Sequence, residues 1–145
     1  MKKDFQILLF YCYAEILDTE KFKTEHHLFC IKNNIKGRII ISSEGINGTV
    51  SGLKKDCDNY RKELISKKIF SDIDFKVEFY HKNTFKKINV RIKNEIVNSG
   101  IIDKKILKNK GQYINPLDFK KIIKKVPENV TILDVRSNYE HNIGK

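Results

Sequence analysis

The sequence has few cysteines and no Cys-x-x-Cys pair. Cys12, Cys30 and Cys57 lie far apart, and no secretory leader precedes them. Small secreted domains instead carry closely spaced cysteines that form disulfide sets. We therefore expect reduced thiols and a cytoplasmic protein.

Long hydrophobic runs are missing as well. The densest run, Phe5–Tyr11, is shorter than the roughly 20 residues with which a helix spans a bilayer, and no cleavage-like site follows it. We expect a buried strand there and no membrane partner.

Repeats and low-complexity tracts are also absent, and 145 residues with 40% hydrophobic content suffice for one domain, or one small domain with part of another.

Arginine is scarce, whereas lysine is abundant. Only four of the 29 basic residues are arginine, yet the formal net charge is +11. A charge of this sign favours anionic partners, with nucleic acid first and an anionic membrane surface second. The alternative is a solvated lysine-rich surface that follows from biased amino-acid usage.

The first third of the chain alternates between strand and helix patterns. The dense apolar content from Phe5 to Tyr13 predicts a strand. Asp18 or Thr19 is expected to cap a helix that Gly37 closes. The apolar stripe of this helix comprises Phe22, Leu28, Phe29, Ile31 and Ile35.

His26 and His27 lie inside this predicted helix. Neighbours in sequence point about 100° apart on a helix, and no second ligand stands four residues away. We therefore expect one histidine on the surface, one half-buried, and no metal site.

The stretch Arg38–Gly52 is expected to form the centre of a sheet. Ile39, Ile40 and Ile41 predict a strand buried on both faces. Asn47-Gly48 supplies the positive φ angles that a tight hairpin needs. A second helix is predicted beyond it, with Cys57 in the core, because four residues share one face: Leu53, Cys57, Tyr60 and Leu64.

A further strand is predicted over Asp74–Tyr80, where apolar and polar residues alternate. The resulting order is strand, helix, strand, strand, helix, strand. This order is typical of the ferredoxin-like or acylphosphatase-like βαββαβ fold, an antiparallel sheet with both helices on one face. We therefore predict an α+β fold, with residues 1–98 as the N-terminal domain.

The segment 84–97 is expected to use the other face of that sheet. Its apolar residues alternate with polar ones and give it one basic edge. The predicted RNA-binding residues are Arg38, Lys86, Lys87, Arg91 and Lys93, which would meet phosphates along the strand. Phe85 or Tyr80 could stack on a base, although packing or a rim position is the alternative, as solubilising charge is for Lys86 and Lys87.

Beyond this segment we predict a basic linker over residues 99–114. Asn115-Pro116 is a helix start signal, with Asn as N-cap and Pro at the first position. Pro127 is expected to end the helix, and Val130–Arg136 predicts a strand.

Three segments resemble one family. Ile41–Gly52 resembles the Glu-Gly-Ile-Asn-Gly-Thr segment of the rhodanese-domain tRNA uridine hydroxylases, and residues 84–97 resemble that family's Phe-Lys-Lys to Lys-Glu-Ile-Val segment. Residues 133–145 resemble the opening of a rhodanese domain, with Lys145 where rhodaneses usually have His. The resemblance implies that residues 115–145 are an incomplete N-terminal part of an α/β rhodanese domain. It also implies tRNA as partner and dioxygen-dependent formation of 5-hydroxyuridine at the wobble base, with no other cofactor evident.

In that family the reactive group is a cysteine on a later rhodanese loop, where its thiolate is stabilised. The chain stops before that loop, so we assign no catalytic residue and expect a truncated form that is inactive alone. One strand and one helix cannot form a parallel α/β core, so we expect residues 130–145 to be loosely held, docked or completed by another chain.

Two other functions stay open. One is a free-standing, non-catalytic RNA-binding module. The other is an acylphosphatase-like hydrolase, which needs a phosphate cradle in the first strand-to-helix loop. That loop, Tyr13–Asp18, has no Gly or Arg and carries two acids, which repel an anionic substrate.

Overall fold

The computed structural model describes residues 4–97, 100 and 111–144, and the chain divides into two units, Met1–Gly100 and Ile101–Lys145. The predicted linker thus lies mostly outside the described residues. The first unit has the predicted βαββαβ order with one further strand. Its elements are β1 (Phe5–Tyr13), α1 (Thr19–Lys32), β2 (Lys36–Ser42), β3 (Gly45–Leu53), α2 (Lys54–Ser66), the 3-10 helix η1 (Lys68–Phe70), β4 (Asp74–Tyr80) and β5 (Ile88–Ile92).

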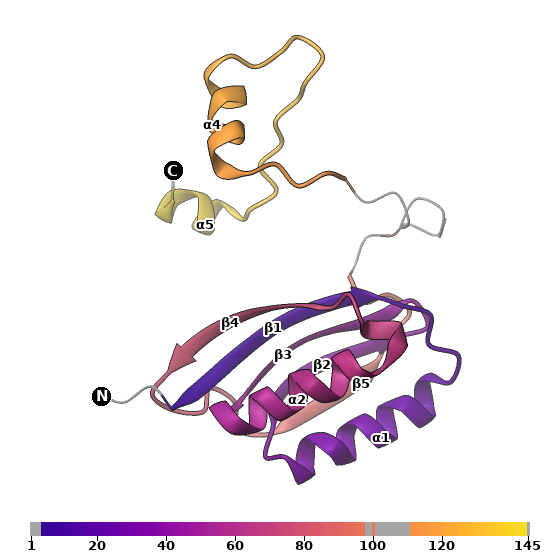
Figure 1. Ribbon diagram of the computed structural model, residues 1–145. Helices are drawn as coiled ribbons and strands as arrows, with labels where there is room; N and C mark the ends of the chain where they lie inside the picture. Colours follow the sequence, from indigo (N-terminus) through magenta and orange to yellow (C-terminus); the bar gives the residue numbers. More distant parts are fainter. Residues whose placement is uncertain (1–3, 98–99, 101–110, 145) are drawn as a thin grey trace. The chain divides into compact units, whose positions relative to one another are not determined.

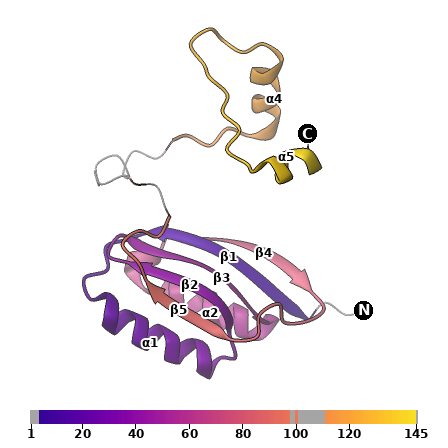
Figure 2. The same ribbon diagram turned by 180° about the vertical axis from the view of Figure 1, so that it is seen from behind.

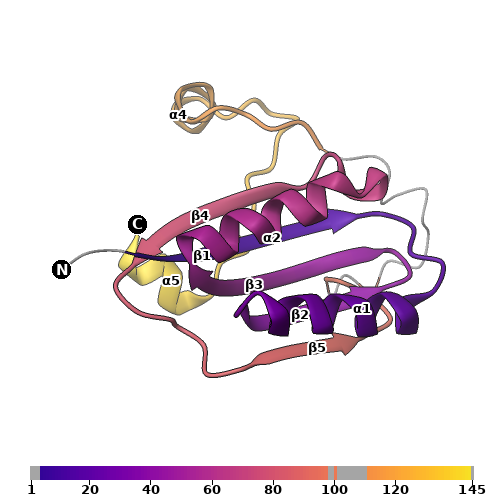
Figure 3. The ribbon, with the colours of Figure 1, turned by 60° about the horizontal axis from the view of Figure 1, so that its bottom comes forward.

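The five strands form one sheet in the order β4-β1-β3-β2-β5, with α1 and α2 on one face (Figures 1 and 3). All pairs are antiparallel except β2 and β5, which run parallel. The core is formed by the inner sides of the helices and by the side chains of alternate residues on the central strands that face the helices. Its largest members include Leu8, Phe10, Ile39, Ile41, Ile46 and Tyr60. The α+β prediction is confirmed.

The prediction for the hairpin is wrong. Ser43 and Glu44 form the turn, whereas Asn47 and Gly48 lie inside β3. Gly45 supplies the positive φ, at +149°, and a Cβ there would meet the Cys12 carbonyl oxygen at 2.1 Å. Gly48 instead makes room for Phe10, whose ring would stand 2.7 Å from a Cβ.

β2 is neither central nor buried on both faces. It lies next to the edge of the sheet, beside β5. Ile39 and Ile41 are buried under the helices, but Ile40 is half-buried and Arg38 is exposed on the opposite face. The three isoleucines therefore follow the alternation of a strand with one open face.

α1 starts as predicted but ends differently. The Asp18 carboxylate accepts from the Lys21 amide at 2.9 Å. At the other end Asn34, with φ of +53°, takes the left-handed position, and the Ile35 amide donates to the Cys30 carbonyl at 2.9 Å. Gly37, predicted to close the helix, lies in β2.

The buried stripe of α1 also differs from the prediction. Leu28 and Ile31 are 61% and 53% exposed, whereas His26 and Cys30 are buried. His26, at 3% exposure, is hydrogen-bonded through Nε2 to the Tyr60 hydroxyl at 3.0 Å. On α2 the predicted stripe is confirmed for Cys57, Tyr60 and Leu64, while Leu53 is exposed.

The segment 84–97 does not lie across the sheet face as predicted. Its central part forms β5, which pairs with β2 from Gly37 to Ile41 and so becomes an edge strand. Without β5 the backbone amides and carbonyls of β2 on that side would have no strand partner. Only the residues after β5 turn onto the open face, which Figure 2 shows.

The second unit contains α4 (Pro116–Lys124) and α5 (Asn138–Ile143). Asn115 caps α4 as predicted, and its side-chain oxygen accepts from the Asp118 amide at 2.9 Å. The strand predicted over 130–136 is absent from the described part of this unit, because no neighbouring strand offers it a hydrogen-bonding ladder. None of the described residues from 111 to 144 is buried, and no described helix of either unit could cross a membrane.

Candidate nucleic-acid interface

The open face of the sheet carries the strongest candidate site. Strand register fixes which side chains share this face, because residues that alternate with the buried core positions point away from the helices. On β1 these are the odd-numbered residues, including Leu9 and Tyr11; on β2 they include Arg38 and Ile40. On β5 they include Asn89 and Arg91.

Three cations gather where β2 and β5 meet. Arg38 is paired in register with Asn89, and Ile40 with Arg91. Lys93 follows directly, its amide donating to the Ile41 carbonyl at 2.9 Å. The three side chains are exposed, and together they border a shallow hollow whose lining is Arg38, Ile39, Ile40, Asn89, Arg91 and Lys93.

The geometry of this corner suits an anion. The Arg91 Nε donates to the Asn89 side-chain oxygen at 3.3 Å, which orients the guanidinium along the strand. Among the described residues, none that lines the hollow has a carboxylate. Long cations at alternate positions of adjacent strands present their donors to one side, where phosphate oxygens can accept from them.

The structure thus brings together three of the five predicted RNA-binding residues. Lys86 and Lys87 are exposed in the loop before β5 and do not line the hollow. The Lys87 carbonyl accepts from the Gly37 amide at 3.1 Å, so this residue helps to start the β2–β5 pairing.

Sequence reasoning missed the apolar half of the open face. Tyr11 and Leu9 are 51% and 46% exposed. The prediction of a buried β1 hid them, because nearly every residue of that strand is apolar. The single polar residue inside it, Gln6, is buried on the helix face. A polar residue in a strand usually marks the exposed face, so Gln6 points to the wrong face.

The far edge of the open face has a different charge. On β4 the residues that share this face are Asp74, Lys76, Glu78 and Tyr80. The β2–β5 edge therefore carries three cations, whereas the β4 edge carries two carboxylates and one lysine. An extended anion is attracted to the first edge and repelled from the second.

The hairpin motif has a structural task beside this site. The Ser42 hydroxyl donates to the Asn94 carbonyl, and the Asn47 side-chain amide, through Nδ2, donates to the Ile96 carbonyl, both at 2.8 Å. The Ile96 amide in turn donates to the Glu44 carboxylate at 2.8 Å. These bonds hold the chain after β5 against one end of the open face, where Ile96 is buried.

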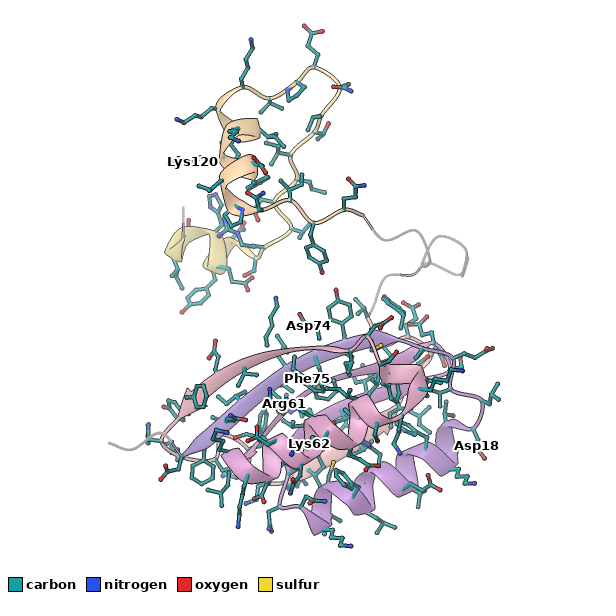
Figure 4. The ribbon with its side chains drawn as sticks, in the orientation of Figure 1. Asp18, Arg61, Lys62, Asp74, Phe75 and Lys120 are labelled. Atoms are coloured by element: carbon teal, nitrogen blue, oxygen red, sulfur yellow. The ribbon has the colours of Figure 1, made fainter. Side chains whose placement is uncertain are left out.

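A second hollow lies between α2 and β4, where Arg61, Lys62, Asp74 and Phe75 are labelled in Figure 4. Two of its three cations are already engaged. Lys54 and Arg61 contact Asp58 at 2.6 and 2.5 Å, and these hydrogen bonds lower the pKa of that carboxyl. It is the weaker candidate for an anion.

Residues 5–96 match the family model described as the UPF0176 acylphosphatase like domain. The chain belongs to this family.

The curated relatives of this UPF0176 chain are named tRNA uridine(34) hydroxylase. The protein from Cytophaga hutchinsonii is 43% identical over 143 residues, which are 99% of this chain and 45% of the relative. The protein from Staphylococcus haemolyticus is 42% identical over 97% of this chain and 44% of its own length. The chain therefore spans less than half the length of these relatives.

Solved structures similar to the UPF0176 chain support the fold. A structure titled "BlrP1 BLUF" has a TM-score of 0.54 at 11% identity and covers 65% of this chain and 67% of its own. "BlrB - a BLUF protein, dark state structure" has a TM-score of 0.52 at 15% identity, covering 63% of this chain and 74% of its own.

The UPF0176 chain offers little nucleophilic chemistry in its described part. Burial raises the pKa of Cys30 to about 12 and that of Cys57 to about 11, so both thiols are neutral at physiological pH. Cys12 is half-buried, with its thiol 3.7 Å from the Tyr13 carbonyl oxygen. Among the described residues no group of His, Cys, Asp or Glu is placed to hold a metal ion.

The first strand-to-helix loop is not a phosphate cradle in this chain. The Ala14 amide donates to the Glu44 carbonyl at 2.9 Å, and the Ile16 amide donates to the Ser43 carbonyl at 3.1 Å. Amides that pair within the protein are not available to bind a phosphate. The geometry therefore disfavours the hydrolase alternative.

Proposed function

We propose that this chain provides the tRNA-binding part of wobble-uridine hydroxylation, the dioxygen-dependent formation of 5-hydroxyuridine. The observation that carries the proposal is the cluster of Arg38, Arg91 and Lys93 on the open face of the sheet, in a chain 43% identical to a tRNA uridine(34) hydroxylase. Exposed cations on one face bind phosphates and release counterions.

In this proposal the chemical step belongs to the length of the relatives that the chain does not span. Cys30 and Cys57 are neutral thiols, so neither can attack as a thiolate. Residues 115–145 would be the first part of a rhodanese domain, residues 1–98 the RNA-holding domain, and the setting cytoplasmic.

Replacing the cations by alanine, with a matched control variant, tests the RNA-binding role. The triple variant Arg38→Ala, Arg91→Ala, Lys93→Ala should bind tRNA roughly tenfold or more weakly. The slope of the logarithm of the binding constant against the logarithm of the salt concentration, here called the salt slope, should become shallower by up to about 2. Each phosphate contact to a single strand contributes about 0.7 to this slope. The control, Lys55→Ala, Lys62→Ala, Lys68→Ala, removes three exposed cations elsewhere, two from α2 and one from η1.

Both variants lose the same formal charge, so net attraction alone predicts equal losses. The proposal requires the open-face variant to lose more affinity and more salt dependence than the control. Equal effects would contradict it and leave the charge as a solvated surface.

A non-catalytic RNA-binding module is the second candidate, with which the neutral thiols of Cys30 and Cys57 agree equally well. Mass spectrometry of tRNA nucleosides distinguishes the two in cells that lack the full-length hydroxylase. Supplying the missing part of a relative together with this chain should restore 5-hydroxyuridine if the chain takes part in hydroxylation, and should not restore it for a free-standing module.

A further inference from the structure

We propose that the open face is a stacking surface for unpaired RNA bases, with Tyr11 as its central contact and the cations of β2 and β5 as its phosphate contacts. The inference rests on the proposed function and names the form of RNA that the site takes, which is a single strand.

Register places the two kinds of contact in the same rows across the sheet. One row runs Asp74, Tyr11, Asn47, Ile40, Arg91, and the next runs Lys76, Leu9, Thr49, Arg38, Asn89. Neighbouring strands lie about 4.8 Å apart, so Tyr11 is about 14 Å from the backbone of Arg91 and Leu9 about 10 Å from that of Arg38. Each row thus offers an apolar contact and a cation, and in the first row the chain after β5 lies at Asn47, between the two.

The Tyr11 ring is exposed, and its contact with the Tyr13 ring helps to fix its orientation. It is 51% exposed, and it meets the Tyr13 ring edge-on with centroids 6.4 Å apart. Leu9, the next open-face residue along β1, extends the apolar surface and is 46% exposed. A strand holds its side chains perpendicular to the sheet, so little entropy is lost when a base stacks there.

The surroundings of Tyr11 favour RNA over a protein partner. The cations at the β2–β5 edge attract phosphates, and Asp74 and Glu78 on β4 repel them. This asymmetry lays the sugar-phosphate chain over β2 and β5 and turns the bases toward β1. A second copy also carries a net charge of +11, so the overall charges of two copies repel each other.

Unpaired bases fit this face better than a duplex does. An A-form helix hides the faces of its bases and presents mainly phosphates and 2′-hydroxyls to a flat sheet. A tyrosine on a sheet surface gains stacking energy only from a base that is free to leave its own stack.

The test measures binding of the 145-residue chain to three probes of one sequence. These are an unstructured RNA decamer, its duplex, and an abasic decamer that keeps the phosphates. Tyr11→Ala and Tyr11→Thr should weaken binding to the decamer about tenfold with an unchanged salt slope. Tyr11→Phe should retain the wild-type affinity, and Tyr11→Thr preserves strand propensity if the alanine variant folds poorly.

Tyr139→Ala is the matched control, because it removes an exposed tyrosine from α5. It should leave all affinities unchanged, and neither Tyr11→Ala nor Tyr11→Thr should affect binding to the abasic decamer. If the Tyr11 variants bind the decamer like wild type while the Arg38, Arg91, Lys93 variant loses affinity, stacking is overturned and the proposed function stands.

Other outcomes also contradict stacking. Equal affinity for decamer and duplex would show that only phosphates are contacted. A wild-type dimer that Tyr11→Ala dissociates would show that the face joins two copies. Equal binding by the open-face and control triple variants would instead remove the proposed function itself.

Discussion

At the scale of single residues, the fold holds His26 neutral. Its imidazole lies between α1 and α2, hydrogen-bonded to the Tyr60 hydroxyl and stacked on Phe22. Burial, followed by the positive charge of Lys67, lowers its pKa from 6.5 to about 4, and Glu63 opposes the shift. The folded state therefore takes up this proton less readily than the unfolded chain.

This suppressed ionisation predicts a pH dependence of stability. Above pH 6.5 His26 is neutral in both the folded and the unfolded state, so its ionisation does not change the free energy of unfolding. As the pH falls from 6.5 to 4 the unfolded chain binds a proton that the folded chain excludes, and about 3 kcal/mol of stability is lost. Urea unfolding across this window measures the loss.

A His26→Gln variant should lose that part of the pH dependence, since glutamine does not titrate. His27→Gln removes the neighbouring imidazole, which is only half-buried, and should keep the wild-type profile. An unchanged slope in His26→Gln would contradict the assignment.

Asn47 predicts a second residue-scale effect. Its side-chain amide is the donor to the Ile96 carbonyl at 2.8 Å. Asn47→Ala leaves that carbonyl without its partner and should lower the free energy of unfolding by about 1–2 kcal/mol. Asn59→Ala, on the exposed side of α2, should change it by less than about 0.5 kcal/mol. Similar losses in the two variants would show that Asn47 does not clamp the chain after β5.

At the scale of elements, the spacing of apolar residues and the helix-capping residues were enough to predict most of the fold. The i, i+4, i+7, i+11 spacing located α2, and Asp18 and Asn115 located two helix starts. Each signal is local, because a cap or a stripe depends on residues within a few turns. The βαββαβ order followed from these signals.

The errors came from tertiary contacts that local patterns do not contain. Asn47-Gly48 has turn chemistry, but the Phe10 ring and the Ile96 carbonyl use those residues inside β3. Gly37 looks like a helix end, yet Asn34 takes the left-handed position first. For the candidate site, the basic alternation of residues 87–93 was visible in the sequence, whereas the register that sets Arg91 beside Ile40 and Arg38 was not.

The extended segment 130–136 provides an element-scale prediction. It lacks strand partners among the described residues of its unit, while Ile39 and Ile41 lie in a strand paired on both sides. Its amides should exchange with solvent at least a hundredfold faster than those of Ile39–Ile41, a ratio that corresponds to about 3 kcal/mol of opening free energy. Equal protection in hydrogen-exchange mass spectrometry would show that another part of the chain or a second copy completes this segment.

At the scale of the whole molecule, charge and fold act together. A ferredoxin-like sheet with both helices on one face leaves the other face open, except at the end where the chain after β5 is held against it. The net charge of +11 draws RNA toward the protein, and the asymmetry between the β2–β5 edge and β4 decides how the strand lies on it. The fold thus supplies the surface, and the sequence makes its β2–β5 edge basic and places Tyr11 on β1, next to the β4 edge.

Photo-crosslinking tests this account most directly. A tRNA carrying 4-thiouridine at position 34, the base named in the relatives, is bound to the 145-residue chain and irradiated. We predict crosslinked peptides from β1, β2 and β5, with the yield at β1 reduced in Tyr11→Ala. Crosslinks confined to α1 and α2 would contradict the claim that the open face of the sheet holds the RNA.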